Sequence, residues 1–332
     1  MKNIALIGTG RHGSRYGQHI FQDISGMQLA GISRQSGELG REQAKRWCTT
    51  YYDDWRSLVA EPHVDAVIAV TPPSLNLDVA RCSARFGKPL LVEKPLARNV
   101  AEATEILQVM DDAGVPLTVG QTLRYNPVIQ ALRAALPGMG QLHSFCANQR
   151  LEPSTLAWHD DRHAAGAGVL FHTAVHVFDA LETITGSRVR RVMAHGRRIH
   201  TKVLEDLVIV NVEMESGVPG MIDVSKVGHA RTGRFEFVCQ SGQLHGDQIH
   251  ACLEIISNSA IVERQSFVQK PTVLHLLQDW QAFLEGRGKN PVSGEEGFSA
   301  VRVCEACLIS MQEQRWVEVI TSVDQAEEGS GP

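Results

Sequence analysis

The fold of this chain is decided by one stretch near its start, Asn3-Ile4-Ala5-Leu6-Ile7-Gly8-Thr9-Gly10-Arg11-His12-Gly13. An apolar run is followed there by glycines in the spacing G-x-G-x-x-G. Gly8 allows a tight turn, Gly10 lets a pyrophosphate approach the backbone, and Gly13 permits close packing of a helix on the strand. A helix that begins at this point directs its free amide groups at the phosphates. The stretch therefore predicts a dinucleotide-binding strand-turn-helix unit.

Strand and helix patterns alternate through the first third of the chain. Short, continuous apolar runs bounded by turn residues are typical of parallel strands buried on both faces. Such runs lie at Ile4–Ile7, Leu29–Ile32, Val64–Val70, Leu90–Val92 and Pro116–Val119. Helical patterns separate them at Ser14–Gln22, Gly37–Trp47, Leu77–Phe86 and Val100–Ala113. The alternation predicts an α/β fold, a doubly wound parallel Rossmann domain over residues 1–121.

The pattern changes after Gln121. A helical pattern at 126–136 is followed by longer alternating segments, which predict antiparallel strands. These segments lie at 142–150, 189–199, 207–215, 219–226, 235–240 and 251–256, with a helix expected near 168–185. We therefore expect a second α/β domain over residues 122–323, with a largely antiparallel open sheet, for substrate binding and oligomerisation. The acidic, Gly- and Ser-containing end at 324–332 is expected to be disordered.

The composition narrows the functional classes. The chain is 43% hydrophobic with a net charge of −5, and it has no basic block that indicates nucleic acid or a membrane surface as a partner. No run approaches the roughly 18 apolar residues of a membrane span, and the first strand begins too early for a signal peptide. We expect a cytoplasmic protein with reduced cysteines. Cys304-x-x-Cys307 lies in a helical pattern, which favours core or boundary thiols over a metal site.

The end of the second predicted strand bears on the choice of cofactor. In NAD sites an acidic residue commonly ends this strand and bonds the ribose 2′-hydroxyl. Here Ser33-Arg34-Gln35-Ser36 offers no carboxylate to repel a 2′-phosphate, and Arg34 can pair with one. The alternative is that Arg34 is a solvated loop cation. The sequence favours NADP(H), with NAD(H) as the alternative, and predicts cofactor contacts from Ser33, Arg34 and the loop residues Arg11 and His12.

A second motif, Glu93-Lys94-Pro95, closes the apolar run Leu90–Val92. A lysine at the carboxyl end of a buried parallel strand lies where open α/β sheets bind ligands. Two more patterns are Ala69-Val70-Thr71-Pro72 and Gly168-Val169-Leu170-(x)5-His176-x-x-Asp179. In this order the motifs resemble those of the Gfo/Idh/MocA oxidoreductases. The resemblance covers nearly the whole chain, including segments at 291–297 and 315–317.

The resemblance implies hydride transfer at a hydroxyl or carbonyl carbon of a sugar, inositol or similar polyol. It maps the family's lysine onto Lys94 and its catalytic histidine onto His176, and it adds Thr71, Pro72, Glu93 and Lys94 to the cofactor contacts. Histidine suits the proton transfer because it titrates near neutrality. A desolvated lysine can hold a developing alkoxide. In relatives the open sheet often forms the oligomer interface, and we expect a homodimer or homotetramer because an apolar sheet face needs a partner.

His172 departs from the family pattern, in which many relatives have aspartate four residues before the catalytic histidine. His172, His176 and Asp179 are four and three residues apart, so they share one face of the expected helix. The change implies a substrate other than a plain polyol, such as one with an acidic group, or weakened catalysis. Two histidines at this spacing can also hold a metal, but a third ligand is not evident and no metal is expected. We assign His172 to both catalysis and substrate binding.

Three further side chains are candidate substrate contacts. Arg124 matches a position where relatives commonly carry arginine, and it contacts cofactor or substrate, or forms an ion pair between the domains. Trp158 lies in a segment that would run toward the substrate, or it packs there. Asp179 binds substrate, orients His176 or makes a surface pair one helical turn away.

These features predict an NADP(H)-preferring dehydrogenase or reductase that acts on a small sugar-like substrate. Two alternatives remain open. Some relatives use bound nicotinamide for a transient oxidation that enables hydrolysis or elimination with no net redox change. The missing aspartate also admits a non-catalytic, nucleotide-binding regulatory protein.

Overall fold

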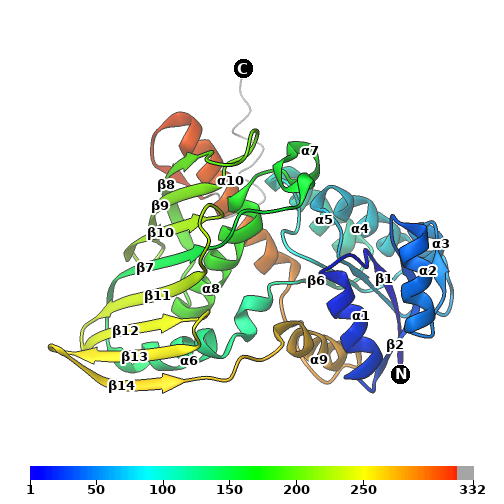
Figure 1. Ribbon diagram of the computed structural model, residues 1–332, viewed down its shortest axis with the longest axis horizontal. Coiled ribbons are helices and arrows are strands. Elements are labelled where there is room, and N and C mark those ends of the chain that lie inside the picture. The colour runs from blue at the N-terminus through cyan, green and yellow to red at the C-terminus, as the bar shows by residue number, and fades with distance from the viewer. Residues whose placement is uncertain (320–332) are drawn as a thin grey trace. The chain divides into compact units, whose positions relative to one another are not determined.

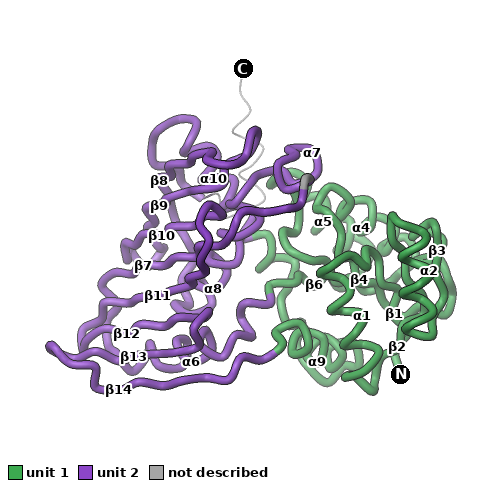
Figure 2. The backbone as a smooth tube through the Cα atoms, in the orientation of Figure 1, with its two compact units in different colours: residues 1–121, 271–298 green, residues 122–270, 299–332 purple. Residues whose placement is uncertain are grey.

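The computed structural model describes residues 1–319, and the chain divides into two compact units (Figures 1 and 2). Unit 1 comprises Met1–Gln121 and Pro271–Phe298, and unit 2 comprises Thr122–Lys270 and the described residues 299–319. Residues 271–298 were expected in the second domain, whereas in the structure they belong to unit 1. The disorder expected at 324–332 lies outside the described residues.

Unit 1 contains one parallel sheet of six strands in the order β3-β2-β1-β4-β5-β6. The strands are β1 (Lys2–Ile7), β2 (Met27–Ser33), β3 (Tyr51–Tyr52), β4 (Ala66–Ala69), β5 (Leu90–Val92) and β6 (Leu117–Val119). Because the chain runs outward in both directions from β1, the order reverses between β1 and β4. Ligands bind at such a reversal, beyond the carboxyl ends of the strands. The predicted doubly wound Rossmann sheet is confirmed.

A helix lies in each of the five connections between successive strands of this sheet. They are α1 (Gly13–Gln22), α2 (Gly37–Arg46), α3 (Trp55–Ala60), α4 (Asn76–Arg85) and α5 (Val100–Asp112), with the short η1 (Pro73–Leu75) before α4. The strands read as continuous apolar runs because both faces are covered: Ile4, Ala5 and Leu6 are all fully buried. A late helix, α9 (Thr272–Leu284), packs against α1 and buries Trp280 completely, which explains why residues 271–298 belong to unit 1.

Unit 2 is built on a nine-stranded sheet in the order β14-β13-β12-β11-β7-β10-β9-β8-β15. The strands are β7 (Leu142–Arg150), β8 (Val189–Arg197), β9 (Leu207–Met214), β10 (Pro219–Ser225), β11 (Thr232–Cys239), β12 (Gly242–Asp247), β13 (Cys252–Ser257), β14 (Ala260–Ser266) and β15 (Val317–Glu318). Among the described strands of this second sheet, β7 and β10 form the one parallel pair, and the other neighbours are antiparallel. The predicted, largely antiparallel second sheet is therefore confirmed.

The helices of unit 2 are η2 (Thr122–Tyr125), α6 (Pro127–Ala135), η3 (Leu136–Met139), η4 (Ala157–Asp160), α7 (Arg162–Ala165), η5 (Leu170–Ala174), α8 (Val175–Thr185) and α10 (Gly294–Glu313), whose first residues belong to unit 1. The longer ones, α6, α8 and α10, lie on one face of the sheet (Figure 1). The sequence predicted one helix near 168–185, but η5 is a π-helix that leads into α8. Short π-helical segments of this kind are frequent at functional sites.

One helical stretch, Arg162–Thr185, has the length and hydropathy of a membrane span, a candidate that inspection of apolar runs did not identify. Of its most apolar window, 78% is buried inside the structure, as in the core helix of a water-soluble domain. The side chains of Phe171 and Phe178 are fully buried, so this stretch serves the core of unit 2. The expectation of no membrane partner stays a prediction.

The other face of the unit 2 sheet keeps large apolar side chains exposed. Ile209, Met221 and Val238 are 40–44% exposed, and all three point away from the buried residues that alternate with them on the same strands. An apolar sheet face of this kind is suited to covering by a second chain. The expected homo-oligomer stays a prediction.

Candidate functional site

The dinucleotide loop of unit 1 has the geometry that its glycine spacing predicts. Gly8 has a φ of +87°, and a Cβ there would lie 2.3 Å from the main-chain oxygen of Val70. A Cβ on Gly13 would lie 2.0 Å from the main-chain oxygen of Gly8, so position 13, where α1 begins, has no room for a side chain. A Cβ on Gly10 would meet no atom within 4 Å. Gly10 is thus unrestricted by the protein, and its lack of a side chain fits the close approach of a pyrophosphate.

Arg34 follows β2 and is hydrogen bonded to the dinucleotide loop. Its Nη1 donates to the main-chain oxygen of Thr9 at 2.9 Å and to Gln43 Oε1 at 3.0 Å. The Thr9 hydroxyl donates to the same Gln43 oxygen at 2.6 Å, and Gln43 Nε2 donates to Ser14 Oγ at 2.8 Å. Arg34 is therefore fixed beside the loop, while its Nε and Nη2 make no hydrogen bond to the described residues. Ser33, one residue earlier, is buried.

A buried carboxylate, Glu93, joins the dinucleotide loop to the end of β5. Its Oε1 lies 2.8 Å from His12 Nε2 and also accepts the Tyr16 hydroxyl, while its Oε2 accepts the Lys94 N–H at 3.1 Å. Burial alone raises the pKa of Glu93, but the hydrogen bond and charge of His12, the Lys94 ammonium and the Tyr16 hydroxyl together hold it below its ordinary value. Glu93 is thus an ionised group next to Lys94, and its part as a direct cofactor contact stays a prediction.

Lys94 and its neighbours are tied to the ends of two strands. The bond between Lys94 and Pro95 is cis, and the side chain of Lys94 is half-buried. Asn76 at the start of α4 donates from Nδ2 to the oxygens of Pro95 and Leu96, at 3.1 and 3.0 Å, and accepts the Thr71 hydroxyl at 3.3 Å. Asn76 therefore ties the Thr71-Pro72 segment after β4 to the turn after Lys94. The role of Thr71 and Pro72 as cofactor contacts stays a prediction.

In unit 2, Arg124 and Asp179 form a buried ion pair. Arg124 Nε lies 2.9 and 3.0 Å from the two oxygens of Asp179, and Nη2 lies 2.6 Å from Oδ1. The side chain of Asp179 is 0% exposed and that of Arg124 is 17% exposed. The expected ion pair thus lies within unit 2 and not between the domains. Because both carboxylate oxygens face Arg124, the structure favours a role in fixing α8 over direct substrate binding by Asp179.

His172 lies in the π-helical turn and packs in a group of aromatic rings. Its ring stacks on that of His159, with centroids 3.9 Å apart and planes 20° apart, and its Nε2 lies 3.3 Å from the main-chain oxygen of His159. The ring of Trp158 packs edge-on against both imidazoles. Because a carbonyl oxygen only accepts, His172 carries its proton on Nε2 in this arrangement. Trp158 and His172, both predicted to meet substrate, are brought together, and His159 joins them.

A pocket of about 250 Å³ opens beside His172 in unit 2. Its walls come from the segment after β7, the start of η5, the loop between β8 and β9, and the end of β10. Its polar lining includes Ser154, His159, Asp160, His172, His200, Thr201, Glu205, Asp206 and Lys226. Among the described residues His172 lines this pocket, whereas His176 does not. The shared face predicted for the two histidines therefore does not bring both to this pocket, and the catalytic role of His176 stays a prediction.

The carboxyl groups of this pocket bind the protein backbone. Asp160 accepts the main-chain N–H groups of residues 202–204 at 2.7–3.0 Å, and Asp206 accepts those of residues 199–201 at 2.6–3.1 Å. Both carboxylates are partly desolvated, but these amides hold their pKa values below the ordinary range. Burial raises the pKa of Glu205, whose Oε1 accepts the Leu170 N–H at 3.2 Å. The three acids thus shape the loop between β8 and β9.

Several residues that organise the site were not predicted from the sequence, namely Tyr16, Gln43, Asn76, His200 and Glu205. Their partners are far away in the sequence: Tyr16 lies 77 residues from Glu93, and Asn76 lies 19 residues from Pro95. A polar residue that interrupts an apolar strand end, as Glu93 does, is the one local signal that could have indicated such a network. In residues 1–319 no group of three or more His, Cys, Asp or Glu side chains is placed to hold a metal ion. The expectation of no metal stays a prediction.

Known proteins with similar sequences act on cyclic polyols. The chain is 24% identical over 238 residues to scyllo-inositol 2-dehydrogenase (NAD(+)) of Bacillus subtilis, and this alignment covers 67% of this chain and 66% of that protein. It is 24% identical over 339 residues to myo-inositol 2-dehydrogenase of Thermotoga maritima, and this alignment covers 95% of this chain and 98% of that protein. The solved structure of levoglucosan dehydrogenase in complex with NADH matches 97% of this chain and 100% of that chain with a TM-score of 0.86, at 21% identity. The last comparison supports the fold alone.

Two family descriptions match most of the chain. Residues 2–121 match the oxidoreductase family with an NAD-binding Rossmann fold, and residues 139–245 match the GFO/IDH/MocA C-terminal domain. The first of these matches spans the dinucleotide loop, Arg34 and Lys94, and the second spans the π-helical turn with His172. The protein is therefore an oxidoreductase of the Gfo/Idh/MocA family with an NAD-binding Rossmann domain.

Proposed function

We propose that this protein transfers a hydride between a nicotinamide dinucleotide and a hydroxyl or carbonyl carbon of a sugar-like or polyol substrate. The observation that carries the proposal is Lys94, placed at the carboxyl end of β5 next to a buried, ionised Glu93. The strand ends beside β1 are where an open α/β sheet binds its ligand. The relatives named above act on inositols, which supports a cyclic polyol as the substrate class.

Each candidate residue has a role in this proposal. The nicotinamide supplies or accepts the hydride when it is bound. Lys94 holds the oxygen at the reacting carbon, since an ammonium stabilises a developing alkoxide. His176 moves the hydroxyl proton, because a group that titrates near neutrality suits this step. His172, Trp158 and the pocket beside them bind the remaining hydroxyl groups of the substrate.

We also propose that the enzyme prefers NADP(H). Ser33 ends β2 without a carboxylate, and Arg34 keeps Nε and Nη2 for a 2′-phosphate while Nη1 holds the loop. Charge-assisted bonds from a guanidinium to phosphate are among the stronger hydrogen bonds in proteins. Related proteins are named for NAD(+) or contain NADH, so the choice of cofactor is a property to be tested on this chain itself.

The first experiment is a substrate screen with NAD⁺ and NADP⁺, in which the absorbance of reduced nicotinamide is followed with myo-inositol, scyllo-inositol, levoglucosan and linear polyols. Lys94→Met and His176→Gln should each lower kcat by roughly 100-fold or more, the usual loss when a proton-transfer or charge-stabilising group is removed. Lys45→Met, which changes an exposed lysine of α2, is the matched control. Full activity in either active-site variant would refute the assigned role. Cofactor that copurifies and turns over without net reduction would instead indicate the hydrolase or lyase alternative.

The second experiment measures the cofactor preference by titrating NADPH and NADH and following energy transfer from tryptophan. Arg34→Ala should raise the Kd for NADPH by about tenfold or more, equivalent to about 1.4 kcal/mol, and leave that for NADH within about twofold. Arg41→Ala removes a solvated arginine of α2 and is the control. An equal loss for both cofactors would mean that Arg34 acts only through its bond to Thr9, and the proposed preference would be rejected.

A further inference from the structure

The loop between β8 and β9 binds the start of η5 through Glu205. The main-chain oxygen of Glu205 accepts the Val169 N–H at 2.8 Å, and its Oε1 accepts the Leu170 N–H at 3.2 Å. At the start of a helix such N–H groups have no partner within the helix itself. A Cβ on Gly168 would lie 1.9 Å from the main-chain oxygen of Glu205, so position 168 has no room for a side chain. The Gly168 oxygen accepts the N–H of His172 at 3.0 Å, and one loop residue thus fixes the turn that carries His172.

Asp160 holds the neighbouring imidazole to the same loop. Asp160 directly follows His159, and its two oxygens accept the main-chain N–H groups of residues 202–204 at 2.7–3.0 Å. Hydrogen bonds to a carboxylate are stronger than those between neutral groups, so three of them make a firm attachment. His159 and His172 are therefore anchored to one loop, although neither residue belongs to it.

The stack of the two imidazoles depends on this shared anchor. Their ring centroids lie 3.9 Å apart with planes 20° apart, and the ring of Trp158 packs edge-on against both. His159, His172 and Glu205 all line the pocket of about 250 Å³. The separation of the two imidazoles therefore decides the spacing of polar groups that a molecule in the pocket meets. Because both rings are anchored to the loop, loss of its Glu205 contact changes that spacing.

We propose that Glu205 is a positioning residue for substrate specificity, which holds His172 against His159 and thereby sets the spacing at which the pocket meets the hydroxyl groups of a cyclic polyol. The inference rests on the proposed function, because it takes this pocket as the substrate site. Among the described residues, the hydrogen bonds of Glu205 lie within unit 2. Its loss should therefore change which polyols bind and leave the cofactor affinity of unit 1 as it is.

The first test observes the stack without catalysis, by nuclear magnetic resonance of protein with isotope-labelled histidine. His159→Gln and His172→Gln assign the two ring signals, which stacking shifts upfield. Glu205→Ala should move both signals toward the positions of unstacked histidine. Glu205→Gln should keep them in place, because its amide oxygen still accepts the N–H at the start of η5. Glu182→Ala is the matched control, since Glu182 also accepts a main-chain N–H, at the start of β8, but does not line the pocket.

The second test measures kcat and KM of the same variants for the polyols of the substrate screen. Glu205→Ala should raise KM by about tenfold and change the ratio of kcat/KM between the two best polyols by a similar factor, with kcat and the Kd for NADH within about twofold of the wild type. Glu205→Gln should restore both KM and the ratio. If Glu205→Ala does not fold, Glu205→Asp replaces it, because its carboxyl group is withdrawn by one methylene and cannot reach η5 in the same way.

The outcomes separate this inference from the proposed function. A Glu205→Ala protein with unchanged histidine signals and an unchanged ratio of kcat/KM, even if it melts at a lower temperature, overturns the inference alone. Glu205→Gln that behaves like Glu205→Ala also overturns it, because the bond to η5 would then not be the cause. Wild-type protein that oxidises none of the polyols overturns the proposed function, and the specificity role of Glu205 with it.

Discussion

Removing Arg124 should destabilise unit 2 because it leaves the buried carboxylate of Asp179 without its cation. The side chain of Asp179 is 0% exposed, and its two oxygens face Nε and Nη2 of Arg124 at 2.6–3.0 Å. Breaking a buried, bidentate pair by deleting one partner costs about 3–5 kcal/mol. Since Arg124 is 17% exposed and keeps part of its hydration, we expect Arg124→Met to lower the free energy of unfolding by about 3 kcal/mol, the lower end of that range.

The assay is urea unfolding followed by circular dichroism, for Arg124→Met, Asp179→Leu and the double variant. Replacing both partners by apolar residues of similar size is often neutral, so the double variant should be more stable than either single variant. The matched control is Arg150→Met, which removes an exposed arginine from its pair with Asp223 and should cost less than about 1 kcal/mol. The reasoning would be refuted if the losses in the free energy of unfolding of the two single variants simply added in the double variant. It would also be refuted if Arg124→Met lost no more free energy of unfolding than the control.

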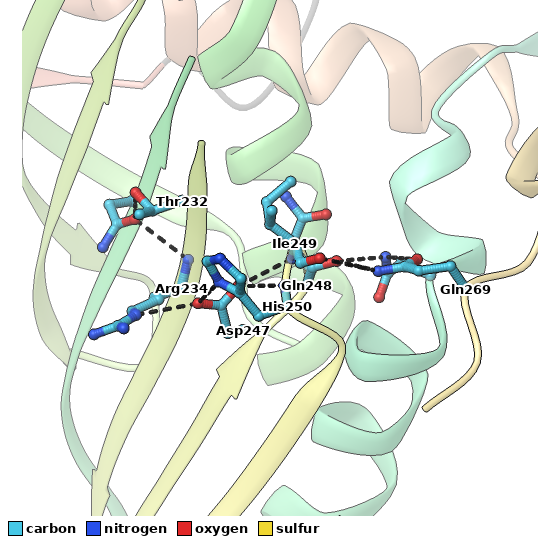
Figure 3. Close-up of polar contacts among 9 residues, drawn as sticks. Thr232, Arg234, Asp247, Gln248, Ile249, His250 and Gln269 are labelled. Atoms are coloured by element: carbon cyan, nitrogen blue, oxygen red, sulfur yellow. Dashed lines mark hydrogen bonds and ion pairs between the residues drawn. The ribbon is translucent and has the colours of Figure 1, made fainter. Parts of the chain in front are cut away.

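Three more predictions test other contacts. Asp247 is buried, which raises its pKa, but its contacts with His250 and Arg234 (Figure 3) hold that pKa below the ordinary value. The ionised carboxylate therefore stabilises the fold at neutral pH, and this stabilisation is lost as the pH falls through the lowered pKa. Asp247→Asn should show a smaller loss of melting temperature between about pH 5 and pH 2 than the wild type. Asn76→Ala removes two buried hydrogen bonds to the turn after Lys94 and should cost about 2 kcal/mol in urea unfolding and weaken NADPH binding, whereas unchanged values in both measurements would show that the turn is held elsewhere. Cys304 and Cys307 are fully buried and form no disulfide, so a thiol reagent should modify them only after denaturant is added, and modification at the rate of the exposed Cys48 would contradict the described core.

The parts of the fold that could be predicted from sequence are those specified by local patterns. The strands of unit 1 are buried on both faces, so apolar runs such as Leu90–Val92 located them closely. The glycine loop was also predictable, because Gly8 and Gly13 meet backbone atoms that leave no room for a Cβ. Residues 271–298 were misplaced because nothing in their own pattern reports that α9 packs on α1. Its position depends on contacts between segments more than 200 residues apart.

In the candidate site too, residues within local motifs could be predicted from the sequence, whereas contacts between distant segments could not. Lys94 and the loop were found from motifs, whereas the partners of Glu93 were not, since His12 lies 81 residues from it in the sequence. The helix periodicity at His172 was correct in placing a helix, but a π-helical turn and a stacked His159 cannot be read from a pattern of four-residue spacing. Asp179 pairs with Arg124, which lies 55 residues earlier and which its own helix pattern could not indicate, and its expected roles toward substrate and His176 stay predictions.

The absence of aspartate at position 172 has a physical consequence for the pocket of unit 2, which we propose to bind the substrate. Its remaining carboxyl groups, Asp160, Glu205 and Asp206, accept main-chain N–H groups and thereby hold the loop between β8 and β9. Carboxylates that are already bonded to the backbone have less capacity to accept substrate hydroxyls. The other polar groups that line this pocket include imidazoles, hydroxyls and the Lys226 ammonium. A neutral imidazole accepts one hydrogen bond where a carboxylate accepts several, so this pocket is expected to select a polyol by fewer, more directional bonds than an aspartate at position 172 would provide.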